Sequence, residues 1–124
     1  MIRDSNIFIG AISALLAVGL GAFGAHALEG ILTETGRLET WETAVQYHFY
    51  HSIAILVSGL LVHHFSNRNV QRAVYAFLLG IVFFSGSLYV LSLTGISVLG
   101  AITPVGGALF ILGWLLLAIG AIRK

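Results

Sequence analysis

The sequence contains no cysteine among its 124 residues. Disulfides, thiol catalysis and zinc or iron–sulfur sites held by cysteine are therefore excluded. Charged residues are also scarce, because they make up 9% of the chain whereas a typical soluble domain carries roughly 25%. The chain has no basic run and a net charge of only +1, so it lacks the electrostatic surface that binds nucleic acids.

Apolar residues are abundant instead, since 58% of the chain is hydrophobic and the mean hydropathy is +0.99. The core of a bilayer is about 30 Å thick and takes about 20 apolar residues per helix, so four helical spans account for most of the chain. The apolar runs place these spans at about residues 7–28, 44–65, 70–93 and 104–122. The expected fold class is an all-α membrane protein, in which four transmembrane helices form a compact bundle and residues 1–124 form a single domain.

The one strongly polar stretch lies between the first two expected spans, at residues 29–43, and contains four glutamates and Arg37. From Leu38 onward the apolar residues recur with helical spacing. This pattern predicts a short amphipathic helix that lies at the membrane interface in the first external loop. Farther along the chain, Thr103 followed by Pro104 is typical of a helix start, and it opens the fourth span.

The distribution of basic residues predicts how the chain crosses the membrane. Cytoplasmic loops carry an excess of lysine and arginine. Arg37 is the only basic residue of this kind in the first and third loops, whereas the N-terminus, the second loop and the C-terminus hold Arg3, Arg68, Arg72, Arg123 and Lys124. The sequence therefore predicts a multi-pass protein of the cell inner membrane with both termini in the cytoplasm.

Small residues recur along every expected span at spacings of three, four or seven. Such spacing puts them on one stripe of a helix and lets a neighbouring backbone approach closely. Within one bundle these stripes pack helix against helix, and between chains they would serve a homo-oligomer or a partner membrane protein. The glycines predicted to pack helices are Gly10, Gly21, Gly24, Gly59, Gly80, Gly106, Gly113 and Gly120.

Polar residues near the outer half of the expected bundle form the second candidate feature. Ionisable residues inside a membrane are functional candidates, and imidazole is a common ligand of zinc, copper and haem iron. No H-E-x-x-H or comparable motif accompanies the histidines, and the acids close to them lie in the first loop, so we expect no metal, no cofactor and no enzymatic activity. The candidates are His26, Glu42, Gln46, His48, His51, Ser52, Ser85, Ser87 and Thr103.

Four short motifs occur in order along the chain: GAFGAH at 21–26, YHS at 50–52, FSGSLY at 84–89 and TPVGG at 103–107. Together with the pair Gly113-Trp114, they resemble the YgdD/YwdK-like family of small inner-membrane proteins over nearly the whole chain. The resemblance implies a four-span protein of about this length and supplies no catalytic residues to carry over. The candidates that fall within family motifs are His26, His51, Ser85, Ser87 and Thr103.

Three functional hypotheses follow. The first is a structural or accessory protein whose bundle binds lipid or a partner membrane protein. The second is a small transporter or channel whose polar path passes His26, His48, His51 and Ser87. The third is a metal- or haem-binding membrane subunit. Proton-coupled cation export of the small multidrug type lacks its central residue, because no carboxylate lies inside the first, third or fourth expected span.

Overall fold

The structure is a computed structural model that describes residues 5–65 and 67–123. All regular secondary structure within these residues is helical, which confirms the expected all-α class. The elements in order are α1 (Ser5–Ala25), α2 (Glu29–Glu34), α3 (Leu38–Leu61), α4 (Asn69–Gly80), the π-helix η2 (Ile81–Gly86), α5 (Ser87–Thr94), the 3₁₀-helix η3 (Ser97–Ala101) and α6 (Thr103–Ile122).

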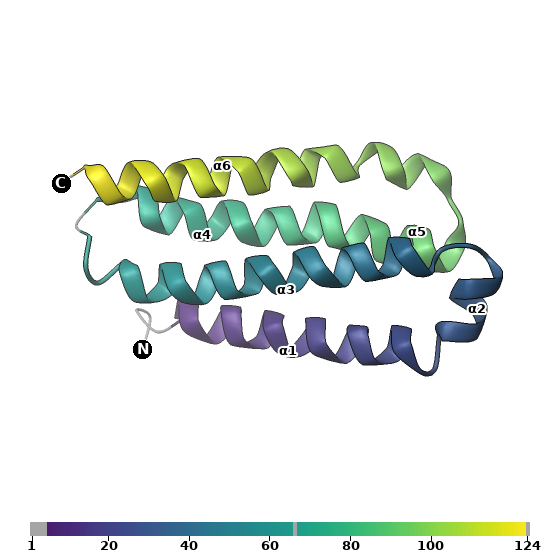
Figure 1. Cartoon of the computed structure of the whole chain (residues 1–124). Coiled ribbons are helices and arrows are strands. Elements are labelled where there is room, and N and C mark those ends of the chain that lie inside the picture. The colour runs from purple at the N-terminus through teal and green to yellow at the C-terminus, as the bar shows by residue number, and fades with distance from the viewer. Residues whose placement is uncertain (1–4, 66, 124) are drawn as a thin grey trace.

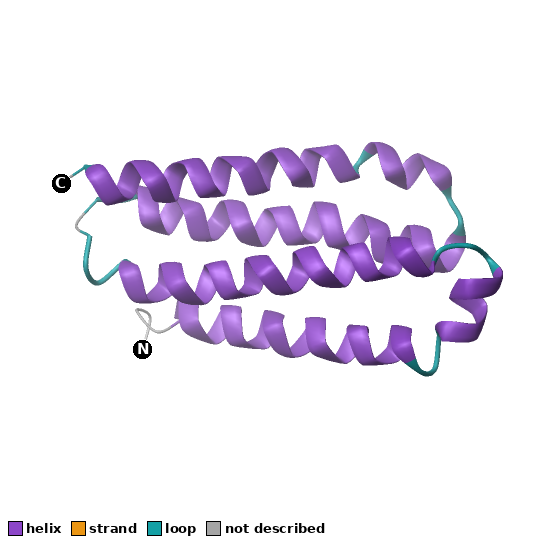
Figure 2. Ribbon diagram, in the orientation of Figure 1, coloured by secondary structure: helices purple, strands orange, loops and turns teal. Residues whose placement is uncertain are grey.

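These elements form four rods that run side by side: α1, α3, the continuous α4–η2–α5 segment, and α6 (Figure 1). The connections lie at the two ends of the rods, and Figure 2 shows that they are short. α1 packs along α3, α3 packs along α4, and α4 packs along α6. α1 and α6 therefore lie on opposite sides of a central pair. α2 and η3 lie at one end of the bundle, and the α3–α4 connection lies at the other.

Among the described residues, three segments are long and apolar enough to cross a membrane: Ser5–Ala25, Asn69–Thr94 and Ser97–Ile122. The helix α3 has the necessary length, 24 residues, but its part from Leu38 to His51 contains glutamates, two histidines and Gln46, which make it less apolar. The expectation of four spans therefore depends on α3, which corresponds to the second expected span, at about residues 44–65. This helix packs between α1 and α4 in the middle of the bundle.

The segment between α1 and α3 differs in detail from the expectation. The helical pattern that begins at Leu38 is the start of α3 and continues without a break to Leu61, so it is no separate interfacial helix. The short helix of this segment is α2, which lies earlier in the chain. Gly36 separates the two helices with φ +73°, a left-handed conformation that a residue without Cβ adopts most readily.

All eight predicted packing glycines face a neighbouring rod at close range. A Cβ built on any of them would lie no farther than 3.1 Å from an atom of another residue, whereas Gly19, Gly30 and Gly100 have nothing within 4 Å. The stripes therefore serve contacts within the one bundle. The contacts pair Gly10 with Leu56, Gly21 with Val45, Gly24 with Trp41, Gly59 with Asn6, Gly80 with Phe110, Gly106 with Phe84, Gly113 with Phe77 and Gly120 with Val70.

The bundle also carries apolar side chains on its outside. The buried core is centred on Ile55, Val74, Phe77 and Phe110. Large apolar side chains on all four rods nonetheless remain exposed, and they include Leu15, Leu60, Val82 and Ile111. A soluble protein rarely exposes an apolar surface on every side, whereas a bilayer covers such a surface without cost.

Candidate functional site

The structure divides the predicted polar residues into an exposed group and a buried group. His26, Glu42 and Gln46 are exposed near the end of the bundle that carries α2. His26 lies in the turn after α1, where its backbone N–H bonds to the carbonyls of Ala22 and Phe23. The structure therefore does not bring His26 together with the other two histidines. The buried group comprises His48, His51, Ser52, Ser85 and Ser87, and Thr103 is half-buried.

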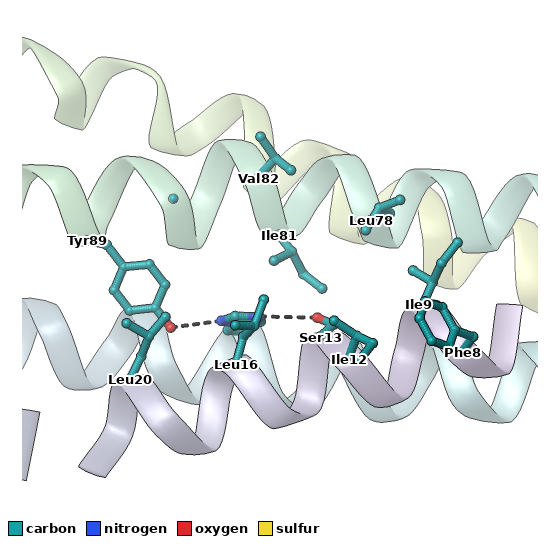
Figure 3. A pocket seen from close by; sticks show the side chains of 12 residues that line it. Phe8, Ile9, Ile12, Ser13, Leu16, Leu20, Leu78, Ile81, Val82 and Tyr89 are labelled. Carbon is teal, nitrogen blue, oxygen red and sulfur yellow. Dashed lines mark hydrogen bonds between the residues drawn. The ribbon is translucent and has the colours of Figure 1, made fainter. Parts of the chain in front are cut away.

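His48 lies in a chain of hydrogen bonds that joins three of the four rods. Its Nδ1 atom is 2.9 Å from the hydroxyl of Tyr89 in α5, and its Nε2 atom is 3.1 Å from Oγ of Ser13 in α1. Ser13 Oγ is in turn 2.6 Å from Oγ of Ser52, which bonds to the carbonyl of His48 at 2.7 Å. Figure 3 shows Tyr89 and Ser13 at the two ends of the dashed lines that meet the imidazole.

Counting donors fixes the direction of this chain. A carbonyl only accepts, so Ser52 donates its single proton to the backbone of His48 and must accept from the hydroxyl of Ser13. Ser13 then accepts from the Nε2–H group of His48. A neutral imidazole has one N–H, so its Nδ1 atom accepts from the hydroxyl of Tyr89. Each polar group of this hydrogen-bonded chain has a partner, and the direction of the bonds places a proton on Nε2 of His48.

His51 belongs to a separate contact on the other side of α3. Its Nδ1–H group donates to the carbonyl of Tyr47 at 2.8 Å, and its Nε2 atom accepts from the indole N–H of Trp114 in α6 at 3.1 Å. The ring stacks on Phe110, with centroids 3.6 Å apart and planes 8° from parallel. His51 therefore ties α3 to α6 as a neutral ring with both nitrogens occupied.

The buried hydroxyls of the third rod connect elements rather than gather at a common site. Ser85 Oγ donates to the carbonyl of Ala44 in α3 at 2.7 Å. Ser87 Oγ donates to the carbonyl of Phe84 at 2.9 Å, so it accepts from the hydroxyl of Thr103, 2.7 Å away at the start of α6. Ser85 lies within the π-helix and Ser87 directly follows it; the wide turn of this helix is a rare feature that sequence reasoning did not identify.

Several residues of these networks were not among the predicted candidates. Ser13 is buried on the same face of α1 as Gly10 and Ala17, so its place on the small-residue stripe was an available signal. Tyr89 lies within the family motif at 84–89. Trp41 is buried, and its indole N–H donates to the carbonyl of α1 residue Leu20 at 2.9 Å.

A first cavity lies between α1 and the α4–η2–α5 rod, and we call it the α1 groove. Its volume is about 480 Å³, and it opens on the side of the bundle. The polar atoms of Ser13, His48 and Tyr89 bond to one another at its floor. The rest of the lining is apolar, as Figure 3 shows: Phe8, Ile9, Ile12, Leu16, Leu20, Leu78, Ile81, Val82 and Gly86.

A second cavity lies between α3 and α6, and we call it the α6 groove. Its volume is about 610 Å³. The π-helix separates the two cavities, since Ile81, Val82 and Gly86 line the α1 groove whereas Phe84 lines the α6 groove. The lining of the α6 groove is aromatic to a much greater extent: Tyr47, His51, Phe84, Pro104, Gly107, Ala108, Phe110, Ile111 and Trp114.

The arrangement of the histidines bears on metal binding. In the described part of the chain, no three histidine, aspartate or glutamate side chains lie close enough to hold one ion. The two buried histidines also use both ring nitrogens in hydrogen bonds, so neither presents a free lone pair to a cofactor. What the geometry provides is a set of neutral links between rods and two grooves of different chemistry.

Comparison with known proteins agrees with the membrane character of the bundle. The family described as "Protein of unknown function (DUF423)" matches residues 20–107. The UPF0382 membrane protein YwdK of Bacillus subtilis is 51% identical over 118 residues, which cover 94% of this chain and 95% of the relative. A UPF0382 membrane protein of Staphylococcus epidermidis is 50% identical over 117 residues, which cover 94% of each chain. No solved structure matches. The chain therefore belongs to the DUF423 family and is, like these relatives, a small membrane protein with the YwdK-like sequence that its motifs indicated.

Proposed function

We propose that the protein is a four-span, non-enzymatic accessory protein of the cell membrane that binds lipid. In this proposal α3 crosses the membrane in addition to the three more apolar segments, α2 lies at the outer interface, and both termini are cytoplasmic. The support for α3 as a membrane span is its central position, because it packs against α1 on one side and α4 on the other. A helix in that position crosses the bilayer together with its neighbours.

The charges at the two ends of the bundle support the orientation. The end that carries α2 holds four glutamates, and the end with the α3–α4 connection holds Arg68, Arg72 and Arg123. Arginine and lysine are retained on the cytoplasmic side. The arginine-rich end therefore faces the cytoplasm in our proposal, and α2 faces outward.

The observation that carries the lipid proposal is the α1 groove. It opens sideways between two rods, at the level where the proposed bilayer surrounds the bundle. Its floor has no free O–H or N–H donor among the described residues, because the protons of Ser13, His48 and Tyr89 are used in bonds to Ser52 and to one another. A volume of about 480 Å³ is within the range of small-molecule sites. In a bilayer the ligand that fits such a groove is the acyl chain of a phospholipid.

The transport hypothesis has less support. A proton path needs a group that can pass its proton onward, whereas the chain through His48 ends on a backbone carbonyl of its own helix. His26, which the path would require, lies apart from both buried histidines. These neutral, fully bonded links favour a role in holding the rods together at about 1 kcal/mol per contact.

Gly86 offers a direct test, because it lines the α1 groove and a Cβ there would approach no atom closer than 3.9 Å. Gly86→Leu therefore fills the groove without disturbing the helices. Gly107→Leu is the matched control, since Gly107 lines the α6 groove with a nearest atom also at 3.9 Å. We expect native mass spectrometry to show bound phospholipid on the wild type and on Gly107→Leu, and less on Gly86→Leu.

Two results would contradict the proposal. One is equal phospholipid retention by all three proteins. The other is a loss of oligomers in Gly86→Leu with unchanged lipid, because the groove would then hold a helix of a second copy or of a partner protein.

A further inference from the structure

We propose that the α6 groove binds lipophilic cations, which place a positive centre against aromatic rings and an apolar tail toward the bilayer. The inference is independent of the lipid proposal, because it concerns the opposite side of the bundle and a different ligand class. It rests on the aromatic lining of the groove, on the lack of basic side chains among its described lining residues, and on the charge of the nearby end of the bundle.

Aromatic rings from three rods meet at the groove. The ring of Tyr47 lies 4.7 Å from Phe84, and Phe84 lies 5.3 Å from Phe110. Tyr47 and Trp114 remain 39% and 48% exposed, so their rings are accessible from the groove. The face of an aromatic ring is negative, and several faces around one space are the arrangement that recognises quaternary ammonium groups.

The hydrogen bonds of the groove disfavour other ligands. An anion needs a positive charge or several donors, but the indole N–H of Trp114 is used by His51, and the N–H of His51 is used by the carbonyl of Tyr47. The hydroxyl of Tyr47 is then the one unused side-chain donor among the described lining residues. No lysine or arginine lines the groove. A lipophilic cation needs neither, because the ring faces stabilise its charge and the apolar walls bury its carbon groups.

The charge near the groove favours a cation as well. The end of the bundle that carries α2 holds four carboxylates and the single guanidinium of Arg37. Glu39, Thr43, Tyr47 and His51 follow one another at four-residue spacing along α3, so they form one stripe that leads from the acidic end into the groove. A cation is thus attracted to the entrance, and an anion is repelled.

The α1 groove lacks this combination. Its lining is mostly aliphatic, and its two aromatic residues other than His48, Phe8 and Tyr89, lie at opposite ends of the cavity (Figure 3). The structure therefore assigns different ligands to the two sides of the bundle, and each groove can serve as a control for the other.

Tetraphenylphosphonium and tetraphenylborate provide a sharp test, because they have the same shape and apolar surface but opposite charge. We would measure the binding of both ions by equilibrium dialysis with the full chain in nonionic detergent. We expect tetraphenylphosphonium to bind to the wild type and to Gly86→Leu, and to lose most of its affinity for Gly107→Leu. Equal binding of the two ions, or unchanged binding to Gly107→Leu, would overturn the proposal.

Tyr47→Leu separates the contribution of the ring from that of the cavity. The hydroxyl of Tyr47 has no hydrogen-bond partner among residues 5–65 and 67–123, and the carbonyl that His51 uses remains in the variant. We expect about fivefold weaker binding of tetraphenylphosphonium, which corresponds to one partly desolvated cation–π contact. Unchanged affinity in a variant that elutes as the wild type in size-exclusion chromatography would show that the rings do not bind the cation.

Discussion

Two adjacent glycines of α6 make a quantitative test of the packing, because they differ in what a single methyl group would meet. An alanine Cβ at Gly106 would overlap the backbone nitrogen and Cα of Phe84 in the π-helix. An alanine Cβ at Gly107 would approach nothing closer than 3.9 Å. The two substitutions add the same atom to the same helix, so their difference isolates the contact between α6 and η2.

The expected magnitude follows from two opposing terms. Replacing glycine by alanine in a helix interior stabilises a protein by up to about 1 kcal/mol, and this gain applies to both variants. Overpacking costs about 1–3 kcal/mol, and here the obstacle is backbone, which cannot rotate away as a flexible side chain can. We therefore expect Gly107→Ala to be neutral or stabilising, and Gly106→Ala to be less stable than Gly107→Ala by about 1–3 kcal/mol.

The free energy of unfolding can be measured for both variants by titrating the detergent-solubilised protein with dodecyl sulfate and following helix content by circular dichroism. Equal stability of Gly106→Ala and Gly107→Ala would refute the close approach of α6 to the π-helix. It would also weaken the general reading of the glycine stripes as contacts within the bundle.

Four other substitutions, one of them a control, test the remaining contacts by the same unfolding measurement. Gly113→Leu should disrupt the bundle, because a Cβ there would lie 2.6 Å from Phe77. Ile53→Leu should leave the free energy of unfolding unchanged, because Ile53 is 40% exposed on the outer face of α3. Equal stability of the two variants would contradict the packing role of the glycine stripe. His48→Phe keeps a ring but removes two hydrogen bonds, and we expect a loss of about 1–2 kcal/mol, which an unchanged stability would contradict. Trp114→Phe removes the donor to His51 and should lower the free energy of unfolding by about 1 kcal/mol. An unchanged free energy of unfolding would show that this hydrogen bond does not stabilise the bundle.

The sequence allowed the rods and their close contacts to be predicted because both depend on simple periodicity. Length and hydropathy located the third and fourth expected spans within one residue at each end of Asn69–Thr94 and Thr103–Ile122. The helical spacing of the glycines predicted which of them pack against a neighbouring helix, because a stripe of small residues lets another helix approach closely. Neither inference requires knowledge of which rods are neighbours.

The partners of the polar residues could not be predicted in the same way. His48 and His51 are three residues apart, so they differ by about 60° around the helix axis, a spacing that by itself predicts neighbours on one helix face. In the structure that angle is enough for them to contact different rods, because His48 bonds to α1 and α5 whereas His51 bonds to α6. The lateral order of the rods decides this outcome, and hydropathy contains no information about it.

The two grooves were also beyond the reach of the sequence. They arise where the central pair of rods leaves the flanks of α1 and α6 incompletely covered, and the π-helix sets which side chains point to each side. A single extra residue in a helical turn changes which way the side chains after it point. No residue pattern in the segment 81–86 indicated the π-helix.

The most direct test of the account is whether α3 crosses the membrane, because the placement of both grooves in the bilayer depends on it. The chain has no cysteine, so each introduced cysteine reports alone. Gly30→Cys places a thiol within α2 and Gly100→Cys places one within η3, at positions where a Cβ would meet no atom within 4 Å. His64→Cys places a thiol in the exposed α3–α4 connection. We predict that a membrane-impermeant maleimide labels the first two in intact cells and His64→Cys only after permeabilisation. Labelling of Gly30→Cys and His64→Cys from the same side would contradict the four-span account.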